Sequence, residues 1–273
     1  MMKKTALILV TAMIALTACG ADKPAENTVA ATRAAQTTTA DAPAAKAAST
    51  STTVVSPEAT AARAAMGPEA GIDNFDAAAI VSANADKFEA GKDYMVLTPT
   101  QPTSSGAGIV EVTEVFMYSC PHCFNFEPFI KGFLKRKPIG VNFVRIPAQF
   151  NKTAQLHAAA YYTAEALGVT EQIHLPMFRA MHTNRNPLSS EAAIKKIFTD
   201  NGVDGDEFAS TFASFNVDSK TREARNLSQR YRIQSVPTLV INGKYVTSGS
   251  MAKSIDRLND IVDYLVAKEM VER

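Results

Sequence analysis

The chain has 273 residues, of which 28 are Lys or Arg and 27 are Asp or Glu, so its formal net charge is +1. This balance gives no basic footprint for binding nucleic acid, and we expect no nucleic-acid partner. After the first twenty residues the sequence has no long apolar run, which argues against a membrane-spanning helix in the processed protein.

Residues 1–18 are typical of an export signal. Lys3 and Lys4 precede an apolar stretch, residues 5–16, that is too short to cross a bilayer as a helix. The segment ends Leu-Thr-Ala before Cys19, and this order resembles the lipobox of bacterial lipoproteins. The resemblance implies that the signal is cleaved before Cys19 and that this cysteine carries lipid. An ordinary secretory signal with an incidental cysteine is the alternative.

Residues 19–70 are predicted to form a disordered tether. The stretch is dominated by Ala, Thr, Ser and Pro, and residues 21–70 contain no aromatic residue, no Leu and no Ile. Such a composition buries too little apolar surface to offset the entropy that an ordered chain loses. The remaining residues suit one domain of ordinary size.

The first part of this domain, residues 71–150, predicts a unit with the order strand, helix, strand. We expect a helix over 75–90, an edge strand at 94–97, a buried strand over 109–118, a helix from 120 with Pro128 inside it, and a strand at 141–146. Consecutive strands joined by a helix usually run parallel, so the two longer strands should be parallel neighbours.

Residues 151–232 predict a helical insertion, with helices over 153–167, 170–182, 190–200, after a cap at Asp204, and over 218–231. The last part, 233–273, has strands at 238–241 and 244–247 around an Asn242-Gly243 hairpin turn. An amphipathic helix then carries Ile255, Leu258, Ile261, Val262 and Leu265 on one face. The expected fold is therefore α/β, a thioredoxin-like fold with an inserted helical domain.

Cys120 and Cys123 stand two residues apart where the buried strand gives way to a helix. A zinc site needs two further ligands, and the chain offers no second close Cys or His pair, so we expect no metal. A purely structural disulfide would close so short a loop that it constrains the unfolded chain little. A redox-active pair is the interpretation that this context favours.

The chemistry of a helix start supports the redox interpretation. Unpaired backbone N–H groups and the positive end of the helix dipole favour a thiolate at Cys120. Pro121 suits the first helical position because its fixed φ matches the helix. His122 would favour the thiolate further by its charge or a hydrogen bond. Cys123 lies one turn deeper on the same face, within reach of a disulfide.

With these residues in place, the chain from about residue 88 to residue 270 resembles the DsbA family of periplasmic disulfide oxidases. The strand before CPHC, the helical insertion, and Val236-Pro237 ahead of the Asn-Gly hairpin carry the resemblance. It implies a strongly oxidising disulfide between Cys120 and Cys123, with no other cofactor. It also implies a cis Pro237 facing that disulfide and a Val236 backbone that pairs with substrate peptide.

The family further implies that Glu114 is a buried carboxylate which helps to move protons at the second cysteine, with Arg145 as a candidate partner. The alternative for Glu114 is an exposed strand residue like Glu111. Expected partners are exported proteins with free thiols, a membrane reoxidant resembling DsbB, and the membrane itself through the lipid anchor. The protein is then a periplasmic monomer.

Two other classes of function stay open. One is a disulfide isomerase or reductase on the same fold, although DsbC-type isomerases add a structured N-terminal dimerisation module. Thioredoxin-type reductants usually carry Trp before the first cysteine, where this chain has Ser119. The other is a non-enzymatic, tethered envelope lipoprotein with an incidental disulfide.

Overall fold

The computed structural model of the protein describes residues 71–273. The predicted signal peptide (1–18), the lipidation site Cys19 and the predicted tether (19–70) lie outside the described residues. The fold below is that of the described part alone.

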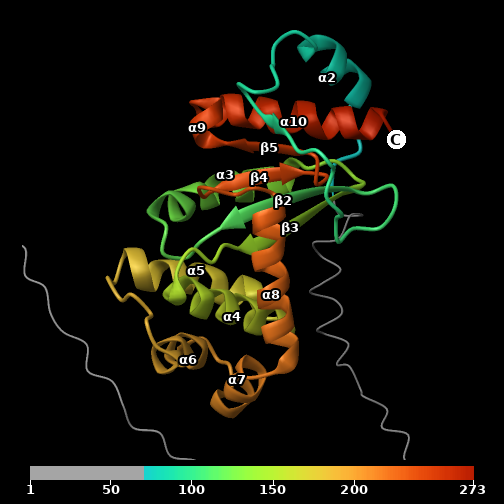
Figure 1. Cartoon of the computed structure of the whole chain (residues 1–273). Helices are drawn as coiled ribbons and strands as arrows, with labels where there is room; N and C mark the ends of the chain where they lie inside the picture. Colours follow the sequence, from blue (N-terminus) through green and yellow to red (C-terminus); the bar gives the residue numbers. More distant parts are fainter. Residues whose placement is uncertain (1–70) are drawn as a thin grey trace, which may run out of the picture. The chain divides into compact units, whose positions relative to one another are not determined.

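A five-stranded mixed sheet lies at the centre of the fold, in the order β1-β5-β4-β2-β3 (Figure 1). The strands are β1 Met95–Val96, β2 Val110–Phe116, β3 Val141–Pro147, β4 Thr238–Ile241 and β5 Tyr245–Ser248. β2 runs parallel to β3, as expected, and antiparallel to β4. Because β2 is a central strand with helices on both faces, it is buried along its whole length.

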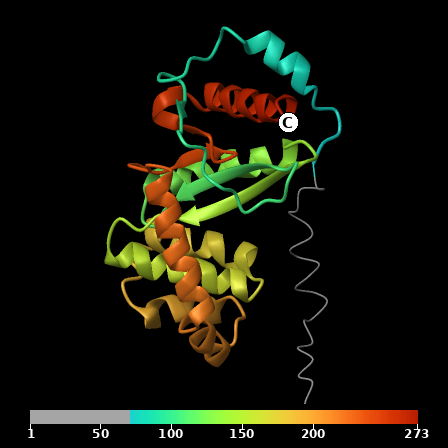
Figure 2. The ribbon, with the colours of Figure 1, turned by 45° about the vertical axis from the view of Figure 1, so that its right-hand side comes forward.

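Helices cover both sides of the sheet. They are α2 Ala77–Asn84, α3 Pro121–Arg136, α4 Lys152–Ala166, α5 Thr170–His182, α6 Glu191–Asp200, α7 Gly205–Phe212, α8 Phe215–Arg230, α9 Gly249–Ala252 and α10 Ile255–Val271. Figures 1 and 2 show α2 and α10 on one side of the sheet and the group α4–α8 on the other. Since α4–α8 lie between β3 and β4 in the chain, they form an insertion between the two halves of the sheet.

Most element boundaries follow local signals. Ser190 and Asp204 cap α6 and α7, and the hairpin residues Asn242 (φ 51°) and Gly243 (φ 61°) have the positive φ values that a tight two-residue turn requires. The helix expected over 75–90 is shorter in the structure, where α2 ends at Asn84. The last helix of the insertion begins at Phe215 rather than 218, because Ser214 caps it.

The core consists of two apolar clusters that meet along β2. Val115, Phe116 and Tyr118 belong to the cluster shared with the helical insertion. Val110 and Val112 belong to the cluster formed with α3 and α10. Burying one such large side chain contributes about 1.5–3 kcal/mol. The end of β2 and the start of α3 therefore lie where the insertion packs against the sheet.

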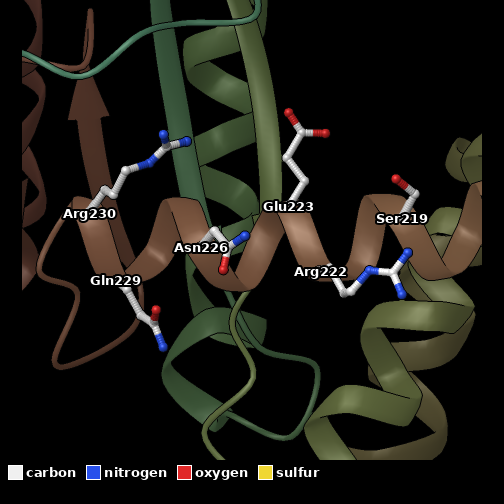
Figure 3. Close-up of a pocket in the computed structure, with 6 residues that line it drawn as sticks. All are labelled: Ser219, Arg222, Glu223, Asn226, Gln229 and Arg230. Carbon is white, nitrogen blue, oxygen red and sulfur yellow. The ribbon is translucent and has the colours of Figure 1, made fainter.

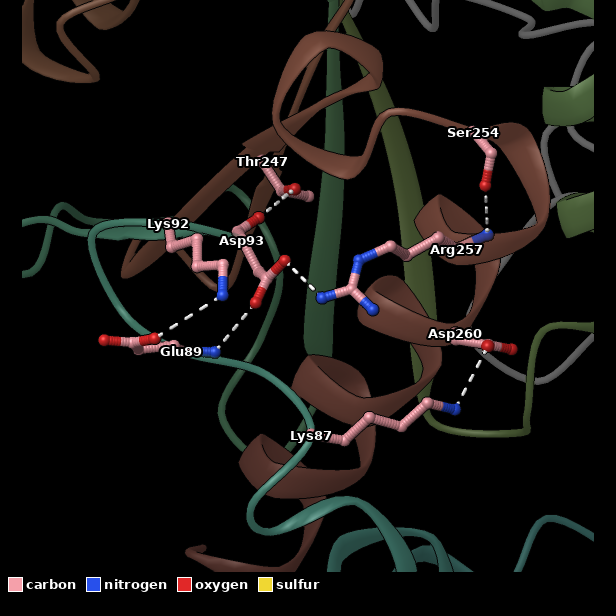
Figure 4. A network of polar contacts seen from close by, with 8 residues as sticks. All are labelled: Lys87, Glu89, Lys92, Asp93, Thr247, Ser254, Arg257 and Asp260. Atoms are coloured by element: carbon pink, nitrogen blue, oxygen red, sulfur yellow. Dashed lines mark hydrogen bonds and ion pairs between the residues drawn. The ribbon is translucent and has the colours of Figure 1, made fainter.

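The segment before β1 is fastened to α10 and β5 by polar contacts (Figure 4). The Arg257 guanidinium pairs with the buried Asp93 carboxylate, which also accepts the Glu89 backbone N–H at 3.0 Å. Thr247 donates its hydroxyl to the Asp93 carbonyl at 2.8 Å. Burial alone would raise the pKa of Asp93, but the Arg257 and Glu89 donors outweigh it and lower that pKa. The segment is thus part of the folded domain.

Candidate active site at the start of helix α3

The CPHC sequence forms the first turn of α3. Cys120 is the N-cap residue, with extended backbone (φ −91°, ψ 115°), and Pro121 is the first helical residue, as expected. The backbone N–H groups of Cys123 and Phe124 donate to the Cys120 carbonyl at 3.1 and 3.2 Å. The Cys120 side chain does not cap the helix. Because Cys120 is the N-cap residue, its sulfur lies at the helix end where unpaired N–H groups favour an anion.

The two thiols differ in exposure. Both cysteines are free in this structure; Cys120 is half-buried, whereas Cys123 is completely buried. Burial raises the pKa of the Cys123 thiol, and the neighbouring Cys120 and the Glu114 charge raise it further. An incoming thiol or electrophile can therefore reach Cys120, while Cys123 is the inner partner of the pair.

The loop before β4 places a backbone carbonyl against Cys120. The Val236–Pro237 peptide bond is cis, as the family resemblance implies. The Cys120 thiol donates to the Val236 carbonyl at 3.5 Å, across two halves of the chain that the helical insertion separates. Val236 and Pro237 are half-buried, so this loop borders the accessible sulfur.

Glu114 is fully buried beneath this site and is paired with Arg145. The two residues face each other in the parallel register of β2 and β3, and Arg145 Nε donates to Glu114 Oε2 at 3.0 Å. Burial raises the pKa of Glu114 to about 7; Arg145 opposes this rise and the charge of Glu127 adds to it. Glu114 Oε1 has no hydrogen-bond partner among residues 71–273.

A second buried carboxylate extends this pair toward the helical insertion. Arg145 also donates to Glu127 Oε2 on α3, at 3.3 Å. His174 on α5 contacts Glu127 Oε1 through Nε2 at 3.1 Å, and the Tyr118 hydroxyl contacts His174 Nδ1 at 2.9 Å. Burial alone would raise the pKa of Glu127, but His174 and Arg145 outweigh it and lower that pKa. Five polar side chains thus form one connected network from β2 to α5.

The sequence interpretation missed three members of this network: Glu127, His174 and Tyr118. Glu127 carried a usable signal, because it stands one helical turn after Cys123 on the same face of α3. His174 carried none, since its contact depends on how α5 packs against α3. α5 also holds the active-site loop at a second point, where His182 Nε2 donates to the Tyr118 carbonyl at 2.7 Å.

Two expectations need correction. Glu111 is not exposed, because the loop before β2 covers it: its carboxylate accepts hydrogen bonds from Ser104, Ser105 and Thr113. His122 is exposed and forms no hydrogen bond within the described part of the chain, so a hydrogen bond from its ring to Cys120 is absent from this structure. Its electrostatic effect on the Cys120 thiolate stays a prediction.

Other possible sites are weaker. Among residues 71–273, no three His, Cys, Asp or Glu side chains lie together in a way that could hold a metal ion. None of the helices within residues 71–273 combines the length and the apolarity needed to cross a bilayer. A surface hollow is lined by polar residues of α8 alone (Figure 3): Ser219, Arg222, Glu223, Asn226, Gln229 and Arg230. Its lining includes neither a cysteine nor a histidine.

The sequence of this chain is similar to those of known proteins. A family model described as a DSBA-like thioredoxin domain matches residues 111–264. The thiol:disulfide interchange proteins DsbA of Pseudomonas aeruginosa and Burkholderia cepacia are each 35% identical to the chain, over 189 and 190 residues, which cover 69% and 70% of this chain and 89% and 90% of those proteins.

A solved structure agrees with these sequence matches. The crystal structure of Pseudomonas aeruginosa DsbA matches with a TM-score of 0.66 at 35% identity, covering 69% of this chain and 97% of that one. The expected thioredoxin-like fold and the family resemblance are confirmed.

Proposed function

Since this chain belongs to the DSBA-like thioredoxin family and is a thiol:disulfide interchange enzyme, we propose that it oxidises exported proteins in the periplasm with a Cys120–Cys123 disulfide. The difference between the two thiols carries the proposal. Cys120 is accessible at the helix start, and Cys123 is buried with its thiol pKa raised. A substrate thiolate is thus directed to one of the two sulfurs.

The reaction proceeds in two exchanges. A substrate thiolate attacks Cys120 Sγ, the Cys120–Cys123 bond breaks, and its electron pair leaves on Cys123. A second substrate thiolate then attacks the substrate sulfur of this mixed disulfide, which releases oxidised substrate and a Cys120 thiolate. Two electrons pass from two substrate thiols to the cysteine pair. The helix start stabilises the departing Cys120 anion, so the second exchange is favoured.

The buried Cys123 leaving group needs a proton, and Glu114 can supply it. The pKa of Glu114 is raised to about 7, so its carboxyl is partly protonated near neutral pH. Its charge also raises the pKa of the Cys123 thiol, so the two groups interact electrostatically. The proton passes from the carboxyl to the Cys123 sulfur as the disulfide opens.

Substrate binding is assigned to the loop of Val236 and Pro237. The Val236 carbonyl already accepts a hydrogen bond from the nucleophilic thiol, so a peptide paired with this backbone would hold its sulfur beside Cys120. The substrates are exported proteins with free thiols. A membrane oxidant resembling DsbB restores the disulfide, and a lipid on Cys19 keeps this monomer at the membrane.

Trapping the mixed disulfide tests the proposal. In the Cys123→Ser variant, Cys120 is first converted into a mixed disulfide with a small aromatic thiol. A peptide with one cysteine should then displace that thiol and form a stable mixed disulfide with Cys120, because no inner thiol can resolve it. The matched Cys120→Ser variant should form none. Equilibrating the wild-type Cys120–Cys123 pair with reduced and oxidised glutathione gives its reduction potential, and this potential should be that of a strong oxidant. A pair as hard to reduce as a structural disulfide, or trapping at Cys123, would contradict the proposal.

A further inference from the structure

The buried network contains two carboxylates and only one strong cation. Arg145 is shared between Glu114 and Glu127. If both carboxyls were ionised, the pair would hold an uncompensated negative charge in a site from which water is largely excluded. Like charges that share a site usually retain one proton between them. The question is which carboxyl keeps that proton.

The hydrogen bonds of His174 are fixed by their partners. The pKa of Glu127 is lowered, so its carboxylate is ionised and only accepts hydrogen bonds; His174 Nε2 then carries a proton and donates a hydrogen bond to Glu127 Oε1 at 3.1 Å. Burial lowers the pKa of His174, which keeps the ring neutral. Its Nδ1 is then an acceptor, and the Tyr118 hydroxyl donates a hydrogen bond to it, with 2.9 Å between the oxygen and the nitrogen. One tautomer satisfies both ends of the ring.

These hydrogen bonds make the two carboxyls unequal. Ionised Glu127 accepts from both Arg145 and His174, whereas Glu114 accepts from Arg145 alone and its Oε1 has no partner among the described residues. We propose that His174, supplied by the helical insertion, is a positioning residue that keeps the shared proton on Glu114 rather than on Glu127. Hydrogen bonds to an ionised carboxyl favour its charged form, so the proton goes to the other group.

Other charged and titratable groups face this network. They are Cys123 on α3, Tyr161 on α4, Tyr118 after β2, and Glu171 on α5 itself. Cys123 and the two tyrosines stay neutral near neutral pH because their pKa values are raised, and Glu171 acts on His174. None of the four donates a hydrogen bond to either carboxyl. Glu127 is more exposed than Glu114, with 18% against 0% of the side chain accessible, which acts in the same direction as His174. The experiment must separate these two causes.

The consequence for chemistry rests on the proposed function. Glu114 interacts electrostatically with Cys123, so a proton on Glu114 can serve the sulfur that leaves when the disulfide opens. A proton on Glu127 would instead reside on the other partner of the shared Arg145. The helical insertion would then contribute to proton transfer through one histidine, which forms no hydrogen bond to either cysteine.

Two substitutions test the two ring nitrogens of His174 one at a time. His174→Gln places an amide N–H where Nε2 donates to Glu127. His174→Asn is shorter and places its oxygen where Nδ1 accepts from Tyr118, so Glu127 loses its donor. His157→Asn is the matched control, because His157 is also a buried histidine of the insertion but bonds to the Leu188 carbonyl instead of a carboxylate.

The readout is the carboxyl carbon shift of ¹³C-labelled Glu114 and Glu127 in the reduced protein between pH 5 and 9. In the wild type, Glu114 should titrate near neutral pH and Glu127 should stay ionised. His174→Asn should move the proton toward Glu127 by about tenfold or more, because a hydrogen bond to a charged group is lost. His174→Gln and His157→Asn should both resemble the wild type.

An unchanged titration of Glu114 in His174→Asn would overturn the proposal, since burial alone would then decide where the proton resides. If His174→Asn fails to fold, ¹⁵N spectra of the wild-type imidazole decide instead: an unprotonated Nε2 would also overturn it. The reaction rate of the oxidised enzyme with a thiol peptide at pH 6–7 should fall in His174→Asn alone. An inert cysteine pair would abolish that reaction in the wild type and leave the carboxyl titration intact, so the two proposals fail separately.

Discussion

Replacing Glu114 by Gln should make the stability of the reduced protein less sensitive to pH. The carboxyl is completely buried, and its pKa is raised from the ordinary 4.5 to about 7, chiefly by burial. Between these two values the folded state binds more protons than the unfolded state, so wild-type stability falls as pH rises. The contribution of Glu114 to the free energy of unfolding is fully present below pH 4.5 and is lost as the pH rises above about 7.

The magnitude follows from the two pKa values. A change of one in a pKa corresponds to about 1.4 kcal/mol, so the wild type should lose about 3 kcal/mol from this group across the window. Gln has no charge to bury and does not titrate. The difference in unfolding free energy, Glu114→Gln minus wild type, should therefore rise by about 3 kcal/mol between pH 4 and pH 8.

The assay is urea unfolding at several pH values, with both cysteines kept reduced by a phosphine. Glu111→Gln is the matched control: it lies on the same strand and is equally buried, but its carboxylate accepts hydrogen bonds from Ser104, Ser105 and Thr113. It should lower stability, because Gln cannot accept all of these hydrogen bonds, and it leaves the Glu114–Arg145 pair intact. A flat difference for Glu114→Gln would refute the idea that Glu114 retains a proton near neutral pH.

Further outcomes are expected at the cysteines. Cys120 should be alkylated well before Cys123 at mildly acidic pH, because Cys123 is buried and its thiol pKa is raised; peptide mapping after brief alkylation would show the order, and a faster Cys123 would contradict it. The reduced protein should resist denaturant better than the oxidised one, because the helix start stabilises a Cys120 thiolate that the disulfide lacks and so short a loop gains little entropy; a more stable oxidised form would contradict a strong oxidant. Cys19→Ser should lose lipidation but keep thiol oxidation by the folded domain, and radiolabelled palmitate still entering this variant would exclude Cys19 as the anchor.

Local sequence determined the elements that carry the cysteines. A β-branched run predicted β2, and proline after the first cysteine predicted the start of α3. Asn242-Gly243 predicted the hairpin between β4 and β5. These features depend on backbone preferences of neighbouring residues, which act over a few positions and are visible in the sequence. The sequence also indicated Arg145 as a candidate partner of Glu114, because the two residues lie on neighbouring parallel strands, where they are paired in the register.

Tertiary structure alone decided the environment of the site. Glu111 is buried because the loop that contains Ser104 and Ser105 folds over it. The alternation of residues along the strand does not predict where that loop lies. The contact of His174 with Glu127 depends on how α5 packs against α3, and neither helix encodes that placement in its own residues. Burial and long-range hydrogen bonds set the pKa of a carboxyl, and both arise only when distant segments come together.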